Sequence, residues 1–230
     1  MKTYKYFSTF TGIGGFEIGI HKAIPNAVCV GYSEIDKYAT QIYQRHYPNH
    51  KNYGDITKIN EKELPDFDLL VGGFPCQSFS IAGKRGGFSD TRGTLFFDIA
   101  RIIKHKKPRI LLLENVKGLL SHANGQTFRT IITTLDELGY DAQWQLLNSK
   151  NFGVPQNRER VYIVGHLRGT PRPQVFPFTR ENETTDRALF ADESQYRREG
   201  KLREYQGTSP TINTGGGGRT LATRHTKSKG

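Results

Sequence analysis

The sequence predicts an α/β fold built on a doubly wound, mostly parallel sheet with an antiparallel hairpin near its carboxyl end. Short apolar and β-branched runs alternate with amphipathic stretches of helical period, which is the pattern of strands joined by crossover helices. The last two strand-like runs are separated only by the loop NSKNFGVPQNRE, so they are expected to pair antiparallel.

The first half of the chain supplies three strands and two helices. A first apolar run stops at Gly12, and the amphipathic stretch after it closes before Pro25, which predicts a strand, a turn and a helix. Asp36 is a candidate N-cap for the next helix because its short carboxylate can accept a backbone N–H. In order, the expected elements are strand 4–11, helix 15–24, strand 27–32, helix 36–46 and strand 67–71.

The second half continues the same rhythm. The run Arg109–Leu113 is almost continuously apolar, which is typical of a parallel strand covered on both faces. Gly139 is expected to end the helix before it. The expected elements are helix 94–105, strand 109–113, helix 126–138 and strands 142–147 and 160–165, which together predict a Rossmann-like sheet.

The composition of the chain changes near residue 167. Prolines at 171, 173 and 177 are followed by a charged stretch and a glycine run. A chain of 230 residues suffices for one α/β domain and a small appendage. We therefore expect a domain at 1–167 and an irregular extension at 168–230. The glycines Gly215–Gly218 fit a flexible linker as well as a recognition element.

Composition restricts the functional classes. The 33 Lys and Arg residues exceed the 22 Asp and Glu residues, and the formal charge of +11 favours a polyanionic partner through phosphate neutralisation. No apolar stretch is long enough to cross a bilayer, and the start MKTYKYFSTF does not fit a signal peptide. A cytoplasmic protein, associated with the nucleoid if the source is bacterial, is expected.

The two cysteines differ in their surroundings. Their separation fits neither a disulfide scaffold nor a zinc site, so no metal is expected. Cys29 lies in the apolar run AVCVGY and is expected to be a buried strand residue. Cys76 lies in GGFPCQSFS, among glycine, proline and polar residues, where a structural thiol would be unusual.

A glycine-rich turn over Phe10–Phe16 follows the first strand and precedes the first helix, where glycines allow close approach of a ligand. Glu34 ends the second strand 22 residues after Gly12 and is placed to bind ribose hydroxyls, which predicts a nucleoside-containing cofactor. The same acid could instead cap a helix. In the loop 54–57, Asp55 could accept from an adenine amino group or cap a turn.

The segment Gly72–Ser80 follows a strand at the edge where α/β sheets bind ligands, and it contains Pro-Cys-Gln. This segment resembles the nucleophile loop of the DNA cytosine-C5 methyltransferases. Further motifs of that family follow in order across about 1–168: the turn at 10–16, Glu34, Gly-Asp-Ile-Thr at 54–57, Arg-Gly-Thr-Leu-Phe-Phe at 92–97, Glu-Asn-Val at 114–116 and Gln-Asn-Arg-Glu-Arg at 156–160.

The resemblance implies a role for each matching residue. Cys76 would attack C6 of cytosine as a thiolate, and Glu114 would hold or protonate N3. Arg158 and Arg160 would reach the cytosine O2 and hold the nucleophile loop, although surface arginines are the usual fate of such a pair. The target base would have to leave the duplex, because the attack is impossible on a stacked base.

By the same resemblance the cofactor is S-adenosyl-L-methionine and the substrate is duplex DNA. The implied cofactor contacts are Phe10, Thr11, Gly12, Gly14, Gly15, Glu34, Ile35, Asp55, Ile56, Pro75 and Leu95. The implied DNA contacts are Gln77, Ser78, Lys84, Arg85 and Arg92. The stretch Ser78–Ser89 carries three glycines and a Lys-Arg pair, which favours a lid that closes over DNA, with an ordinary surface loop as the alternative.

The chain departs from the family pattern in two places. Ser8 stands where the family usually has an acidic residue two positions before the phenylalanine. The closing motifs of the family are not visible after residue 168, where Ser-Pro-Thr-Ile at 209–212 only loosely resembles a recognition region. We therefore expect a second polypeptide that supplies these parts, with a truncated inactive remnant and an engineered fragment as alternatives.

Other functions remain to be compared with this one. A non-catalytic module could bind S-adenosylmethionine or DNA without turnover, and transfer RNA could replace DNA as the substrate. A nicotinamide-dependent oxidoreductase would share the glycine turn and the strand-end acid. That class leaves Pro-Cys-Gln, Glu-Asn-Val and Gln-X-Arg-X-Arg unexplained.

Overall fold

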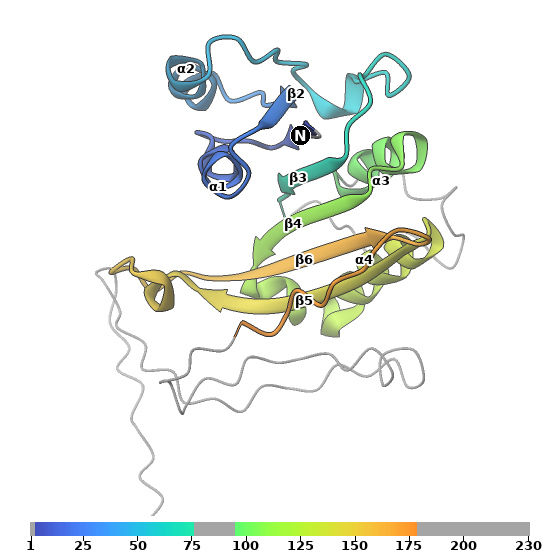
Figure 1. The fold of residues 1–230 in the computed structure, drawn as a ribbon. Helices are drawn as coiled ribbons and strands as arrows, with labels where there is room; N and C mark the ends of the chain where they lie inside the picture. The colour runs from blue at the N-terminus through green and yellow to red at the C-terminus, as the bar shows by residue number, and fades with distance from the viewer. Residues whose placement is uncertain (1–2, 76–94, 179–230) are drawn as a thin grey trace, which may run out of the picture.

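The computed structural model describes residues 3–75 and 95–178. Within these ranges the chain forms one six-stranded sheet with helices on both sides (Figure 1). The strands and α-helices are β1 (Tyr4–Thr9), α1 (Gly15–Ala23), β2 (Ala27–Ser33), α2 (Lys37–His46), β3 (Leu69–Gly73), α3 (Leu95–Lys106), β4 (Ile110–Val116), α4 (Gln126–Glu137), β5 (Tyr140–Asn148) and β6 (Glu159–Leu167). The expected order of strands and helices is confirmed.

The sheet has the strand order β2-β1-β3-β4-β6-β5. The pairs β1–β2, β1–β3 and β3–β4 are parallel, whereas β6 runs antiparallel to both β4 and β5. The antiparallel hairpin is therefore confirmed. The sequence pattern did not predict that β6 lies between β4 and β5, because each strand's own periodicity does not reveal its neighbours.

Strands β3 and β4 extend further toward their carboxyl ends than the sequence indicated. The third strand begins two residues later than expected, and Gly72 and Gly73 belong to it because they pair with Leu113 and Glu114 of β4. Strand β4 continues to Val116, which pairs with Arg160 of β6. These ladders hold both a glycine pair and Glu114 at fixed positions in the sheet.

Each face of the sheet has its own apolar cluster. Helices α3 and α4 pack on one face in a cluster that includes Phe96, Ile99, Ile103, Leu111, Leu113, Phe128, Ile131 and Ile163. On the other face Ile20 and Phe16 of α1 meet Tyr6, Leu69 and Val71, and Tyr43 of α2 stacks on Tyr32. None of the helices in the described ranges is both long and apolar enough to cross a bilayer.

Cys29 lies in β2 as expected, but it is half-buried rather than fully buried because β2 is an edge strand. Its thiol donates to the carbonyl of Gly31 at 3.4 Å. Burial raises the pKa of the Cys29 thiol to about 11, so the thiol stays protonated at neutral pH. A structural role for this cysteine fits its surroundings.

The chain after β6 turns back and follows β5 (Figure 1). The side-chain amide of Gln143 accepts from the N–H of Val175 at 2.9 Å, and that of Gln145 accepts from the N–H of Phe178 at 2.9 Å. Residues 168–178 are thus fastened to the sheet by two β5 side chains. The domain boundary at 167 stays a prediction.

Candidate active site

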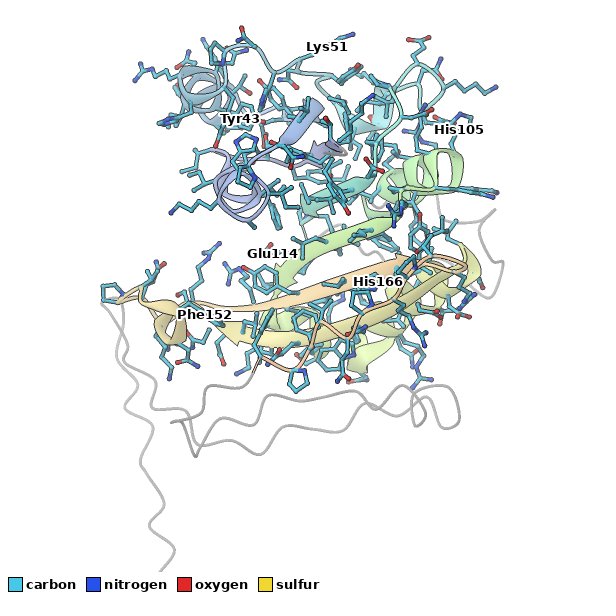
Figure 2. The ribbon with its side chains drawn as sticks, in the orientation of Figure 1. Tyr43, Lys51, His105, Glu114, Phe152 and His166 are labelled. Atoms are coloured by element: carbon cyan, nitrogen blue, oxygen red, sulfur yellow. The ribbon has the colours of Figure 1, made fainter. Side chains whose placement is uncertain are left out.

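The carboxyl ends of β1, β2, β3 and β4 bring the candidate residues to one edge of the sheet. Parallel strands end at the same edge, and loops there bind ligands in open α/β sheets. The glycine-rich turn follows β1, Glu34 follows β2, and Glu114 lies near the end of β4 (Figure 2). The segment that leads to Cys76 leaves the end of β3.

The glycine-rich turn is held in a strained backbone conformation. Phe10 has a φ of 52°, which is rare for a residue with a side chain, and its N–H donates to the carbonyl of Ser33 at 2.8 Å. Gly12 and Gly14 have φ angles of 55° and 95°, which glycine adopts without steric cost. Left-handed residues without this freedom cluster at ligand-binding sites, so Phe10 marks the turn as a candidate site.

The Glu34 carboxylate links the glycine-rich turn to the backbone that follows β2. Its Oε2 accepts from the N–H of Gly12 at 2.8 Å, and its Oε1 accepts from the N–H groups of Ile35 at 2.9 Å and Asp36 at 2.8 Å. Asn52 fixes the Glu34 backbone by donating to its carbonyl at 3.0 Å. A carboxylate has about four acceptor positions, so these three bonds leave one for a ligand hydroxyl.

The turn fits the cofactor that the resemblance implies. Thr11 is 6% exposed, and within the described residues its hydroxyl has no hydrogen-bond partner. Buried polar groups are normally hydrogen-bonded, so this hydroxyl is available to a ligand atom. Ile13 of the same turn and Ile35, which follows Glu34, are 58% and 75% exposed, and apolar side chains of this kind can cover a purine ring. A Cβ added at Gly12 would meet no atom within 4 Å, which leaves space next to the backbone.

The other predicted cofactor residues have mixed surroundings. Asp55 caps the 3-10 helix η1 (Ile56–Lys58) by accepting from the N–H of Thr57 at 3.0 Å, so it does cap a turn. The side chain of Ile56 is 2% exposed and lies in the core, so only its backbone remains for a ligand. Leu95 is partly buried against the same core, and Pro75 is exposed.

Glu114 combines partial burial with a cationic partner. Its side chain is 20% exposed, and its Oε1 lies 2.8 Å from Nε of Arg160. Burial raises the pKa of Glu114 above its ordinary value of 4.5, whereas the charges of Arg160 and Arg158 act against that rise. A carboxyl with a raised pKa keeps its proton to a higher pH than an exposed carboxyl does, which suits a proton donor.

Gly73 makes room for this carboxyl. A Cβ at Gly73 would lie 2.8 Å from Oε2 of Glu114, so any larger residue would displace the carboxyl. A Cβ at Gly72 would lie 2.0 Å from the hydroxyl of Thr9. The two positions therefore require glycine for different steric reasons. A side chain at position 72 would collide with Thr9, and one at position 73 would collide with Glu114.

Arg158 and Arg160 differ in their positions. Arg160 lies in β6 and binds Glu114 directly, whereas Arg158 is exposed in the loop before β6 and acts on Glu114 through its charge. The alternative interpretation, two solvated surface arginines, does not fit Arg160, because its side chain is only 19% exposed. The structure therefore brings Arg160 and Glu114 together.

Two buried amides near the site were not chosen from the sequence. Asn115 is 2% exposed, and its side chain donates to the carbonyl of Phe74 at 2.7 Å, which fastens the segment before Cys76 to β4. Asn148 accepts from the N–H of Arg158 at 3.1 Å and so holds the loop before β6. Asn115 belongs to the Glu-Asn-Val motif, which was its signal in the sequence, whereas for Asn148 the signal is a polar residue after the apolar pair Leu146 and Leu147.

The remaining predicted residues lie outside the described ranges. These are Cys76, Gln77, Ser78, Lys84, Arg85 and Arg92, together with the stretch Ser78–Ser89 for which a lid was expected. Their roles stay predictions. The described chain reaches Pro75, one residue before Cys76, and Phe74 there is 3% exposed and fixed by Asn115.

Comparison with known proteins agrees with this arrangement. The type II methyltransferase M1.ScrFI of Lactococcus lactis subsp. cremoris is 56% identical over 162 residues, which are 70% of this chain and 41% of that relative. M.SsoII of Shigella sonnei is 56% identical over 163 residues, which are 70% of this chain and 42% of that relative. The chain thus spans less than half the length of these curated relatives, and nothing in them supports the expected second polypeptide.

The fold is shared with solved structures. The crystal structure of a DNMT2 mutant of Spodoptera frugiperda matches 79% of this chain and 54% of its own with a TM-score of 0.61 at 24% identity. The family model described as C-5 cytosine-specific DNA methylase matches residues 4–228. Together with the 56% identity to the two curated relatives, this match shows that the chain belongs to the C-5 cytosine-specific DNA methylase family.

Proposed function

We propose that this chain is the catalytic part of a DNA cytosine-C5 methyltransferase that uses S-adenosyl-L-methionine. The observation that carries the proposal is the position of Glu114 near the carboxyl end of β4. Its side chain is 20% exposed, is bound to Arg160 and lies against Gly73, just before the Pro-Cys-Gln segment. The family match and the two relatives named as type II methyltransferases support the same reaction.

In this proposal the glycine-rich turn holds the cofactor. Glu34 accepts a ribose hydroxyl at its remaining acceptor position, Thr11 donates its unpaired hydroxyl, and Ile35 covers the purine. Asp55 keeps one oxygen directed at its own turn, and its other oxygen lies 3.7 Å from Lys58. The bound cofactor would supply an electrophilic methyl group beside the base.

The chain's own residues then act on the pyrimidine. The Cys76 thiolate forms a bond to C6, and Glu114 gives a proton to N3 or holds the one there, so the electron pair collects at C5. Arg160 keeps Glu114 in place and Arg158 faces the cytosine O2. After C5 has taken the methyl group, loss of the C5 proton and departure of the sulfur restore the aromatic ring.

The substrate is duplex DNA with the target cytosine turned out of the stack. The net charge of +11 supports a polyanionic partner, and a paired base would not expose C6 to a thiolate. Gln77, Ser78, Lys84, Arg85 and Arg92 are proposed DNA contacts. A restriction-modification role in the cytoplasm, with residues 1–167 as the catalytic domain, belongs to the same proposal.

Methylation of mixed-sequence DNA, with bisulfite readout, tests the reaction. The chain is assayed alone and with the proteins encoded beside it, so the need for a complementing chain is tested as well. We expect 5-methylcytosine at a defined sequence and a covalent adduct with a 5-fluorocytosine oligonucleotide. Cys76→Ser should abolish the adduct, and transfer RNA at the same salt should compete poorly.

A binding measurement separates catalysis from mere recognition. Calorimetric titration with S-adenosyl-L-methionine should show binding that Glu34→Ala weakens and Cys76→Ser leaves unchanged. Cofactor binding without methylation or adduct under any condition would contradict the enzyme and favour a non-catalytic module. Methylation of transfer RNA in preference to DNA would contradict the substrate.

A further inference from the structure

Four strands place one residue each in a row that crosses the sheet at Glu114. Glu114 of β4 pairs with Gly73 of β3 on one side and with Tyr162 of β6 on the other. Tyr162 in turn pairs with Gln145 of β5. Side chains of directly paired residues point to the same face, so the carboxyl, the phenol ring and the amide are neighbours there.

The two neighbours of Glu114 in this row differ in size: Gly73 has no side chain, and Tyr162 has a large ring. The Glu114 carboxyl lies above Gly73, 2.8 Å from where a Cβ would be. Tyr162 is the largest neighbour of Glu114 in the row and is half-buried. Tyr162 is paired directly with Glu114, and burial raises the pKa of Tyr162, with the charge of Glu114 adding to that rise.

Tyr162 itself has little room to move away. The second neighbour of Tyr162 is Gln145, which is 2% exposed. The Gln145 amide oxygen accepts from the N–H of Phe178 at 2.9 Å, and the amide nitrogen donates to the Phe178 carbonyl at 3.4 Å. A buried amide with both ends bound forms a fixed backing. In the paired strands Tyr162 thus lies between Gln145, whose amide is fixed, and Glu114.

We propose that Tyr162 is a positioning residue whose ring, beside Arg160 of the same strand, closes the β6 side of the Glu114 carboxyl and holds its second oxygen on the Gly73 side, where the Pro-Cys-Gln segment begins. This inference rests on the proposed function. The ring excludes water from one side of the carboxyl and so favours the protonated form that can donate to N3 of cytosine. In the described residues, Arg160 and Arg158 are the charged groups that oppose this effect.

The test measures Glu114 directly and does not need turnover. In protein labelled with carbon-13 glutamate, the Glu114 carboxyl resonance is identified by its loss in Glu114→Gln, and its pH titration is followed. Tyr162→Ala should admit water and shift the titration to lower pH, whereas Tyr162→Phe should leave it in place because the ring remains. Val164→Ala is the matched control, since Val164 lies on the same face of β6 opposite Leu112.

The kinetic consequence has a definite sign. If protonated Glu114 is the active form, single-turnover methylation falls as pH rises past its pKa, so Tyr162→Ala should move that falling limb to lower pH. Each unit of the shift corresponds to about a tenfold loss on the alkaline side. A purely structural role would lower the rate at every pH and leave the limb where it is.

Two outcomes would overturn the inference. One is an unchanged Glu114 titration in Tyr162→Ala, and the other is an equal shift in Tyr162→Phe, which would assign the effect to the hydroxyl rather than to the ring. A chain that shows the expected titrations but no methylation would leave Tyr162 in its place and contradict the proposed function instead.

Discussion

Among the residues that the structure describes, two carboxyl groups have a raised pKa, and their surroundings differ. Glu114 is 20% exposed, lies at the edge of the sheet and is bound by Arg160. Glu17 of α1 is 0% exposed, and its pKa is raised by burial although Tyr43 donates to its Oε1 at 3.1 Å. Tyr43 lies on the α1 and α2 side of the molecule, away from Glu114 (Figure 2).

The difference shows that a raised pKa does not by itself identify a catalytic acid. Glu17 is enclosed by aromatic and imidazole groups, since Tyr43 also contacts Nδ1 of His50 at 3.0 Å, and no substrate could reach it there. Glu114 is partly exposed, is bound by the cationic Arg160 and lies near the carboxyl end of β4. Access and charge therefore separate a functional carboxyl from a structural one.

The largest expected effect follows from making the same substitution at both carboxyls. Glu114→Gln should lower methylation by about 10²- to 10⁴-fold, because a general acid is lost, and should leave thermal unfolding nearly unchanged. Glu17→Gln should keep methylation within a fewfold of the parent. Single-turnover rates and melting curves of the two variants decide the matter, and equal losses of activity would erase the distinction.

The two glycines before the Pro-Cys-Gln segment sharpen the comparison further. Gly73→Ala displaces the end of a flexible side chain, so the fold should tolerate it while methylation falls about 10²-fold through misplacement of Glu114. Gly72→Ala meets the hydroxyl and backbone of Thr9 and should lower stability by about 1–3 kcal/mol. Urea unfolding measures the stability of both variants, and the methylation assay measures their activity. A Gly73→Ala protein that is fully active would contradict the steric role given to Gly73.

The hydrogen bond from Asn115 of β4 to Phe74, which precedes the Pro-Cys-Gln segment, should matter for both stability and methylation. Asn115→Ala removes the buried donor to the Phe74 carbonyl and should cost about 1–3 kcal/mol of folding free energy while reducing methylation. Tyr140→Phe is the matched control, because it removes a buried donor to the carbonyl of Pro108 far from the site. If both variants lose stability and keep activity alike, Asn115 does not position the segment.

Local patterns predicted much of this arrangement, and long-range pairing accounts for the rest. Asp36 was identified as an N-cap from its place before an amphipathic run, and its side chain does accept from the N–H of Ala39 at 2.7 Å. The row from Gly73 to Gln145 could not be predicted in the same way. It depends on β6 lying between β4 and β5, a neighbour relation that no single strand encodes.

The site residues show the same division. The resemblance to the cytosine-C5 methyltransferases implied Glu114 and Arg160 as site residues, but their contact at 2.8 Å follows from the register of β4 and β6. Tyr162 lies two residues after Arg160 and carries no motif signal, because an aromatic residue in a strand most often serves the core. Its relation to Glu114 appears only once the strands are paired.

The smallest effect concerns stability at the enclosed carboxyl. Because the folded pKa of Glu17 is raised above the ordinary value of 4.5, the folded chain keeps a proton that the unfolded chain releases. The free energy of unfolding should therefore fall as pH rises from about 4.5 to the folded pKa, by about 1.4 kcal/mol for each unit of the shift, and be level outside that window.

Glu17→Gln cannot lose this proton, so its stability should not decline through the same window. The quantity to measure is the difference in unfolding free energy between the parent and Glu17→Gln, obtained from urea titrations at several pH values. That difference should move in favour of the variant as pH rises. A difference that is constant with pH would mean that Glu17 titrates alike in both states, and its enclosure by Tyr43 would then have no electrostatic consequence.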